Sequence, residues 1–284
     1  MWSVAGMSLT LHDTVQLTSG RRMPMLGFGT WKLQEGDEVR DAVVTALKAG
    51  YRHVDTAAMY DNERGVGQAI RDSRVRREEI FLTTKVWNDD IRAGYDAVLR
   101  ACEASLERLK VSYVDLYLLH WPIAEKDREA WRAMETLYRS GKARSIGVCN
   151  YLPHQLDALL PGVGVTPMVN QVEFHPFLLQ PDLAEACAGY GIVREAWSPL
   201  MQGHVGDVPA IVDIAKRLHR TPAQVVLHWA LQHRVVTIPR SSNPKHIAEN
   251  AALFDFELTP DDIALLNELD QNKRFGPDPD RVTF

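Results

Sequence analysis

The chain has 284 residues, of which 45% are hydrophobic and 24% are charged, and its formal net charge is −5. This length and composition are typical of a globular protein with a sizeable core, and we expect a single domain over residues 1–284. The mildly negative charge argues against a nucleic acid as partner, because phosphate-rich polymers are bound by basic surfaces. The sequence has no run of about 20 apolar residues, so we expect no membrane-spanning segment.

The N-terminus and the cysteines indicate a cytoplasmic location. Residues 1–7 have neither the basic nor the apolar region of a secretion signal. We expect residues 1–8 to be a loose tail, with Met7 as an alternative start. Cys102, Cys149 and Cys187 lack the spacing of metal ligands or of a disulfide framework, which indicates reduced thiols.

Short apolar segments alternate with amphipathic ones along the chain. The first element is a predicted β-hairpin over residues 9–25, which contains the turn residues 18–21. The predicted strands that follow cover residues 25–29, 52–55, 80–86, 114–120, 144–149, 168–173, 192–197 and 235–238. The predicted helices cover residues 37–49, 63–71, 95–109, 128–140, a segment after Pro153, 182–189, 209–218, 222–232, 244–252 and 260–269.

This alternation predicts an α/β fold, a (β/α)₈ TIM barrel with an N-terminal β-hairpin and extra C-terminal helices. The alternative is a doubly wound parallel sheet that binds a nucleotide. Such a sheet needs a glycine-rich turn after its first strand. The motif Gly-Phe-Gly at 27–29 lacks the third glycine of that turn, and Gly-Val-Gly at 65–67 lies in a helix-like stretch, so the barrel is favoured.

Polar side chains close several of the predicted strands. Asp55 ends the second strand, Lys85 the third and His120 the fourth, and Tyr60 follows in the loop after Asp55. The later strands carry comparable residues near their ends: Asn150, Gln171, Glu173 and Trp197. Because the carboxyl ends of barrel strands meet at one rim, we expect these side chains to be neighbours in an active site.

These residue types suit proton transfer to a carbonyl oxygen. A charged Lys85 in an apolar strand is costly unless it is paired, and Asp55 is a ready partner. Tyrosine is a poor acid, with an ordinary pKa of about 10, but a nearby ammonium group lowers that pKa. We therefore expect Lys85 to make Tyr60 a general acid, with His120 fixing the direction of the carbonyl. Side chains alone cannot deliver a hydride, so a cofactor must supply it.

Seven motifs, in order along the chain, resemble the aldo-keto reductases. They are Gly-Phe-Gly-Thr-Trp (27–31), Gly-Tyr-Arg-His-Val-Asp-Thr-Ala (50–57), Thr-Thr-Lys-Val-Trp (83–87), Leu-Leu-His-Trp-Pro (118–122), Ser-Ile-Gly-Val-Cys-Asn-Tyr (145–151), Asn-Gln-Val-Glu-Phe-His-Pro (170–176) and Ile-Pro-Arg-Ser-Ser (238–242). The tail over residues 273–280 is similar to that of the microbial branch with 2,5-diketo-D-gluconate reductases, methylglyoxal reductases and trypanosomatid prostaglandin F synthases.

The resemblance implies NADPH-dependent reduction of small aldehydes, dicarbonyls such as methylglyoxal, and keto-sugar acids. It implies that Tyr60 is the general acid, that Lys85 and Asp55 tune its pKa, and that NADPH lies across the barrel mouth without a Rossmann fold. His120 matches the residue that orients the carbonyl. The residues that match the family's substrate-pocket wall are Trp31, Trp87 and Trp121.

The cofactor contacts that the resemblance implies run from the nicotinamide to the adenine. The residues that match the family's contacts to the nicotinamide carboxamide are Asn150 and Gln171, and the one that matches the aromatic on the ring face is Trp197. The loop over the pyrophosphate matches Ser198, Leu200 and Gln202. The 2′-phosphate and adenine contacts match Arg240, Ser241, Ser242, Glu249 and Asn250.

Some positions depart from the family pattern. His246 stands where the family usually has an arginine on the adenine and 2′-phosphate, and a neutral imidazole binds an anion less well. We expect NADPH still to be preferred through Arg240, with weaker discrimination against NADH. Cys149 replaces a common serine, with little expected consequence. The segment from Pro122 to Arg128 is short where some relatives have a long lid, which predicts an open site for small carbonyl substrates.

Three alternatives stay open. His53, His175, Asp55 and His120 are residue types found in barrel metallohydrolases, although we expect no metal. Lys85 could form a Schiff base, as in barrel lyases. A non-catalytic relative could bind NADPH and regulate a partner. The complete set of four catalytic residues favours a reductase, and the resemblance points to a monomer.

Overall fold

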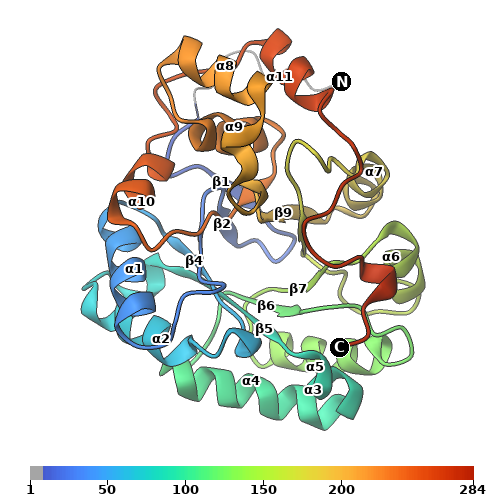
Figure 1. Ribbon diagram of the computed structural model, residues 1–284. Coiled ribbons are helices and arrows are strands. Elements are labelled where there is room, and N and C mark those ends of the chain that lie inside the picture. Colours follow the sequence, from blue (N-terminus) through green and yellow to red (C-terminus); the bar gives the residue numbers. More distant parts are fainter. Residues whose placement is uncertain (1–8) are drawn as a thin grey trace.

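Eight parallel strands form a closed barrel at the centre of the structure (Figure 1). The structure is a computed structural model that describes residues 9–284, so the expected loose tail lies outside the described residues. The strands are β3 Phe28–Gly29, β4 His53–Asp55, β5 Phe81–Val86, β6 Leu116–Leu119, β7 Ile146–Cys149, β8 Val169–Glu173, β9 Val193–Trp197 and β10 Val236–Thr237. They pair in chain order, and a parallel bridge between Leu26 and Thr237 closes the ring. The predicted barrel is confirmed, and the doubly wound alternative is wrong.

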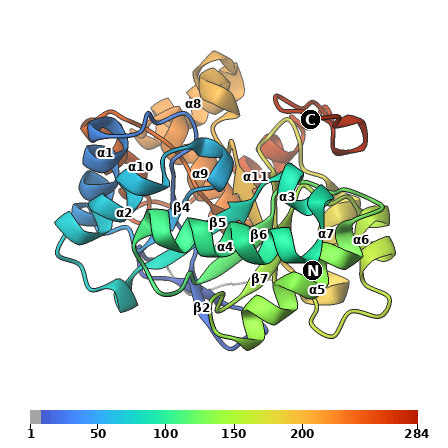
Figure 2. The ribbon, with the colours of Figure 1, turned by 90° about the horizontal axis from the view of Figure 1, so that it is seen from below.

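The predicted N-terminal hairpin is also confirmed. Its antiparallel strands are β1 Thr14–Gln16 and β2 Arg22–Pro24. The hydroxyl oxygens of Ser19 and Ser145 are 2.9 Å apart, which places the hairpin turn beside the start of β7. The hairpin therefore covers the amino ends of the barrel strands. Figure 2 shows it on the face opposite the C-terminus.

Helices surround the barrel, and most of them lie where the sequence predicts. They are α1 Asp37–Lys48, α2 Glu63–Asp72, α3 Asn88–Ala93, α4 Tyr95–Leu109, α5 Asp127–Arg139, α6 Pro153–Leu159, α7 Pro181–Tyr190, α8 Pro209–Leu218, α9 Pro222–Gln232, α10 Pro244–Ala251 and α11 Pro260–Asn267. A proline begins each helix from α6 to α11, because the first helical position needs no backbone N–H. Helix α3 was not predicted from the sequence, because it is too short to show helical periodicity.

The glycines at 65–67 are part of α2 and do not form a nucleotide-binding turn. A Cβ atom on Gly67 would lie 2.3 Å from the carbonyl oxygen of Leu109, the last residue of α4. Glycine at this position lets α2 and α4 pack closely, and this packing explains the motif without a phosphate.

Two hydrophobic cores hold these elements together. The larger core fills the barrel and the space beneath α1–α7. The smaller one lies beneath α8, α9 and α11, where the rings of Phe174 and Trp229 stack with centroids 4.9 Å apart. Among residues 9–284, no helix is long and apolar enough to cross a membrane.

Candidate active site

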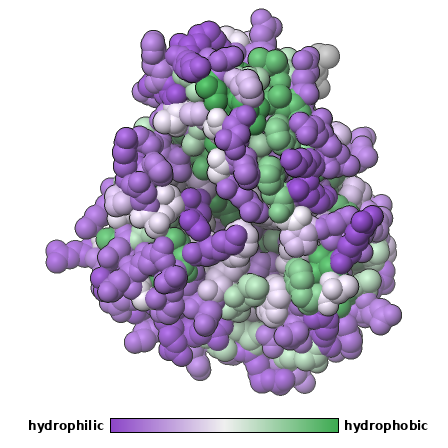
Figure 3. Space-filling model, viewed as in Figure 1, coloured by the Kyte–Doolittle hydropathy of each residue, from purple (hydrophilic) through white to green (hydrophobic). Residues whose placement is uncertain are grey.

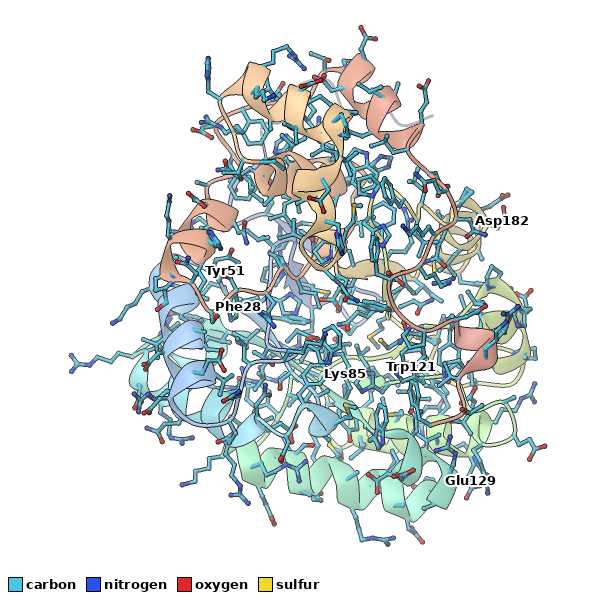
Figure 4. The ribbon with its side chains drawn as sticks, in the orientation of Figure 1. Phe28, Tyr51, Lys85, Trp121, Glu129 and Asp182 are labelled. Carbon is cyan, nitrogen blue, oxygen red and sulfur yellow. The ribbon has the colours of Figure 1, made fainter. Side chains whose placement is uncertain are left out.

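A cavity of about 1090 Å³ opens at the carboxyl ends of the strands. Every residue predicted for the catalytic group, the cofactor and the substrate wall lines this cavity, except Lys85, which is fully buried. Figure 4 shows Lys85 near the middle of the molecule, with Trp121 to one side. The surface on this side is mostly hydrophilic, with hydrophobic residues in its upper part and to the right of its centre (Figure 3). The barrel thus brings together residues that are far apart in the sequence.

Lys85 joins the two other members of the expected catalytic group. Its Nζ atom donates hydrogen bonds to Asp55 Oδ1 at 2.7 Å, to the carbonyl oxygen of Thr56 at 2.9 Å and to Tyr60 Oη at 3.2 Å. Asp55 ends β4, Lys85 lies in β5, and Tyr60 ends the 3₁₀ turn η1, Ala58–Tyr60. Because the Tyr60 oxygen accepts from Lys85, the phenol proton is free to point to another acceptor.

The expected fall in the Tyr60 pKa is wrong as a net direction. Burial raises the pKa of Tyr60 above its ordinary value, and the opposing effect of the Lys85 charge is smaller. Burial lowers the pKa of Lys85. The charge of Asp55 and the other polar neighbours together outweigh burial, so the net change in the pKa of Lys85 is upward. The site therefore holds a protonated phenol above a protonated amine. This is the state that a proton donor requires at neutral pH.

His120 lies against Tyr60 at the cavity wall. The two ring centroids are 5.7 Å apart, and the ring of Trp87 contacts His120 from another side at 5.2 Å. Burial, and then the Lys85 charge, lower the pKa of His120 well below its ordinary value, so the ring is neutral. Its Nδ1 atom has no hydrogen-bond partner among the described residues. A neutral ring with one N–H can orient a carbonyl oxygen.

The two amides expected at the carboxamide already bind protein groups through their nitrogens. Asn150 Nδ2 donates to the carbonyl oxygen of His120 at 3.1 Å, and Asn150 Oδ1 accepts from Trp197 Nε1 at 2.8 Å. Gln171 Nε2 donates to Asp55 Oδ2 at 2.8 Å and to Glu195 Oε2 at 2.9 Å. Among the described residues, the oxygen of Gln171 accepts only from the Cys149 thiol, at 3.8 Å, and both residues line the cavity.

The end of the cavity near α10 is lined by cationic side chains, by hydroxyl groups and by the N-terminus of that helix. Arg240 and Ser241 follow β10, and α10 carries His246 on its exposed side. The Arg240 Nε atom donates to the carbonyl oxygen of Trp31 at 3.0 Å, which fixes the side chain at the cavity rim. Lys32, which the sequence analysis did not single out, also lines the cavity. These groups suit an anion such as a phosphate.

Aromatic rings form the other end of the cavity. Trp87 stacks on Phe284 with centroids 5.7 Å apart, and Trp121 meets the edge of the same ring at 5.6 Å. Asn88 and Arg92 of α3 hold the carbonyl oxygen of Phe284 at 2.9 and 2.7 Å. Phe284 was not predicted as a cavity residue, because the family motifs in the sequence end before it and α3 was not predicted.

Two fully buried acids support this site: Glu173, which the sequence placed among the strand-end residues without a specific role, and Glu195, which it did not single out. Glu195 in β9 contacts Gln171, and Glu173 at the end of β8 accepts from the backbone N–H groups of Phe275 and Gly276. A charged residue within a predicted barrel strand was the signal that could have found Glu195 in β9, as it did for Lys85 in β5.

The structure separates the histidines that suggested a metallohydrolase. His53 Nε2 lies 3.1 Å from Thr83 Oγ1, whereas His175 Nε2 lies 3.0 Å from Glu173 Oε1. In the part of the chain that the structure describes, no three His, Cys, Asp or Glu residues are grouped as metal ligands. His53 and His175 are explained by these contacts within the protein.

The site is thus a lysine-held phenol and a neutral histidine in an aromatic-walled cavity of a parallel eight-stranded barrel, a class of site that suits the binding of a small molecule. Residues 25–271 match the Aldo/keto reductase family. The chain is 50% identical to the glyoxal reductase of Bacillus subtilis over 278 residues, which cover 98% of this chain and all of that protein. It is 45% identical to methylglyoxal reductase DkgA of Escherichia coli, over 94% of this chain and 97% of the relative.

A solved structure is similar throughout. A variant of Gox0644 in complex with NADPH superimposes with a TM-score of 0.90 at 41% identity, over 96% of this chain and 99% of that one. The chain belongs to the aldo/keto reductase family. It is an NAD(P)-dependent oxidoreductase that reduces carbonyl groups.

Proposed function

We propose that this protein uses NADPH to reduce small aldehydes and dicarbonyls, with glyoxal and methylglyoxal as the first candidates and keto-sugar acids as further ones. The observation that carries the proposal is the hydrogen bond from Lys85 to the Tyr60 oxygen at the cavity floor. The names of the relatives above support the choice of dicarbonyls. The aromatic wall and the short segment before α5 suit substrates of small size.

In the proposed reaction, Tyr60 donates its phenol proton to the substrate carbonyl oxygen. The phenolate that remains lies 3.2 Å from the Lys85 ammonium. At an effective dielectric constant of about 20, a charge pair at this separation is worth on the order of 5 kcal/mol. Lys85 therefore favours the product of proton transfer, even though burial keeps the Tyr60 proton in place beforehand. His120 orients the same carbonyl, and Asp55 holds Lys85 in position.

The residues present fit a nicotinamide dinucleotide. The cavity runs from Tyr60 to α10, with the flat ring of Trp197 near one end and Arg240, Ser241 and Ser242 at the other. When bound, NADPH supplies the hydride. The proposed contacts are Asn150, Gln171 and Trp197 to the nicotinamide, Ser198, Leu200 and Gln202 to the pyrophosphate, and Arg240, Ser241, Ser242, His246, Glu249 and Asn250 to the 2′-phosphate and adenine. NADH is the weaker alternative cofactor.

We further infer a cytoplasmic monomer whose partner is a small carbonyl compound. Among residues 9–284, the exposed large hydrophobic residues are Trp31, Met59, Tyr190, Leu265 and Phe284. Trp31, Met59 and Phe284 line the cavity, so little apolar surface is left for a subunit interface. A mass near 32.0 kDa by light scattering is the test.

Tyr60→Phe tests the reaction directly. Because the variant keeps the ring but loses the proton, we expect turnover of methylglyoxal to fall by a factor of about 10²–10⁴ while NADPH binding persists. Tyr190→Phe, on the exposed face of α7, is the matched control. Undiminished reduction by Tyr60→Phe would overturn the assignment.

The same assay separates the alternatives. A regulatory protein would bind NADPH without turnover by the wild type. A Schiff-base lyase would be trapped by borohydride with a carbonyl compound and no nicotinamide; full burial of Lys85 beneath Tyr60 argues against it.

A further inference from the structure

Glu195 is a fully buried acid beneath the mouth of the barrel. It lies in β9, where it pairs in register with Gln171 of β8 and Val236 of β10. Its Oε2 atom accepts a hydrogen bond from Gln171 Nε2 at 2.9 Å. The mechanism proposed above gives this acid no direct contact with the reacting atoms.

The hydrogen bonds of Gln171 fix the orientation of its amide. A primary amide nitrogen carries two hydrogens. In Gln171, one contact goes to Asp55 at 2.8 Å and the other to Glu195 at 2.9 Å, so both hydrogens are used. The amide oxygen is therefore turned away from the two acids. Its neighbour is Cys149 Sγ at 3.8 Å, and both Gln171 and Cys149 line the cavity.

The charges around Glu195 keep it neutral. Asp55 and Glu195 share one nearby ammonium group, and that group, Lys85, contacts Asp55 at 2.7 Å. Burial, and then the negative charge of Asp55, raise the pKa of Glu195 to about 8. Glu195 Oε1 lies 3.5 Å from Nε2 of His53, whose pKa burial lowers to about 3. A neutral acid beside a neutral imidazole can keep its other oxygen as the acceptor for Gln171.

We propose that Glu195 is a positioning residue that acts through Gln171, because it holds the amide so that its oxygen accepts an N–H from the nicotinamide carboxamide. The inference rests on the proposed function, in which Gln171 contacts the nicotinamide. Without the Glu195 acceptor, one amide hydrogen is buried and unpaired. The amide then turns to find another acceptor, and the carboxamide loses its partner.

Two substitutions at this position separate a positioning role from a packing role. Glu195→Gln keeps an oxygen for Gln171 and presents an N–H donor to His53 in place of the O–H donor of the neutral acid. Glu195→Leu fills a similar volume without any acceptor. The readout is the dissociation constant of NADPH, compared with that of 2′,5′-ADP, which lacks the nicotinamide.

We expect Glu195→Leu to raise the dissociation constant of NADPH about tenfold and that of 2′,5′-ADP less than twofold. We expect Glu195→Gln to keep most of the wild-type NADPH affinity. In a Gln171→Leu background, Glu195→Leu should add little to the loss of NADPH affinity. Glu185→Gln, on the exposed face of α7, should leave both constants unchanged.

Three results would overturn the proposal. Wild-type NADPH affinity in Glu195→Leu would remove the role of Glu195 and leave the proposed function intact. Equal weakening of NADPH and 2′,5′-ADP would show a structural role only. Loss of NADPH affinity in Glu195→Gln would show that a negative charge is needed. If the wild type itself does not bind NADPH, the proposed function fails as well.

Discussion

Lys85 and Asp55 show why a buried charge pair belongs in this site. Removing two ions from water costs several kcal/mol for each ion, and their attraction roughly offsets that cost. The side chains of Lys85 and Asp55 are 0% and 2% exposed, so the pair contributes little net stability. What it provides is a permanent positive charge beneath Tyr60. An exposed ammonium at the same distance would be screened by water and would stabilise a phenolate far less.

The buried acid Glu195 gives a pH dependence of stability whose sign follows from its pKa. The pKa rises from about 4.5 in the unfolded chain to about 8 in the folded one. Below pH 4.5 Glu195 is protonated in both states, so its ionisation contributes nothing to the pH dependence of the free energy of unfolding. Between pH 4.5 and 8 the unfolded state ionises first, and stability is lost as the pH rises.

We therefore expect Glu195→Gln to have a higher melting temperature than the wild type at pH 9, with a gap that shrinks towards zero near pH 4.5. Thermal unfolding across that pH range measures it. Glu185→Gln controls for a change of surface charge and should show a flat difference. A gap that is constant with pH would mean that Glu195 is ionised in the folded protein.

At the scale of elements, the C-terminal segment after α11 contacts the barrel through one buried acid, in addition to the contacts of Phe284 with α3. In Figure 1 this dark red segment passes across the molecule to the C-terminus. Glu173 Oε1 accepts from the N–H of Phe275 at 2.7 Å and from that of Gly276 at 3.2 Å. A Cβ atom on Gly276 would lie 2.3 Å from the Trp197 ring, so the segment packs against the proposed nicotinamide platform. It ends at Phe284, against the substrate wall.

Glu173→Leu should loosen this segment, because two backbone N–H groups lose their acceptor. We expect the KM for the carbonyl substrate to rise about three- to tenfold, the kcat to change less, and cleavage by a protease within residues 273–284 to become faster. Glu173→Gln keeps an accepting oxygen and should stay close to the wild type. Unchanged KM and cleavage rates in Glu173→Leu would show that other contacts hold the segment.

The sequence could predict the elements and the strand-end residues, because hydrophobic period and chain order determine which side chains meet at a barrel rim. It could not predict contacts that depend on register, such as Gln171 beside Glu195, or on the path of the tail, such as Phe284 on Trp87. The predicted change in the pKa of Tyr60 was wrong in direction, because the prediction took the Lys85 ammonium into account but left out the burial of the phenol itself. Single-domain organisation and the roles of the cofactor residues stay predictions.

At the scale of the whole molecule, one cavity is lined by elements from the first and the last parts of the chain. It touches β4 through Asp55, β8 through Gln171, and α10 through Asn250, and a ligand that fills it contacts elements far apart in the chain. Such a ligand binds the folded state only and stabilises it by mass action. At a concentration about 100 times its dissociation constant, the gain is about 2.7 kcal/mol, which corresponds to a rise of about 5–10 °C in melting temperature for a chain of this size.

We expect NADPH to raise the melting temperature by about this amount, and NADH at the same concentration to raise it by several degrees less, because only NADPH has a phosphate for Arg240. Arg240→Ala should reduce the NADPH shift to that of NADH. Lys245→Ala removes the same charge from α10 at a residue outside the cavity lining, and should keep the difference. Scanning fluorimetry with both cofactors measures all three. Equal shifts in the wild type would show that the 2′-phosphate gains no net binding energy from Arg240, and would overturn this assignment.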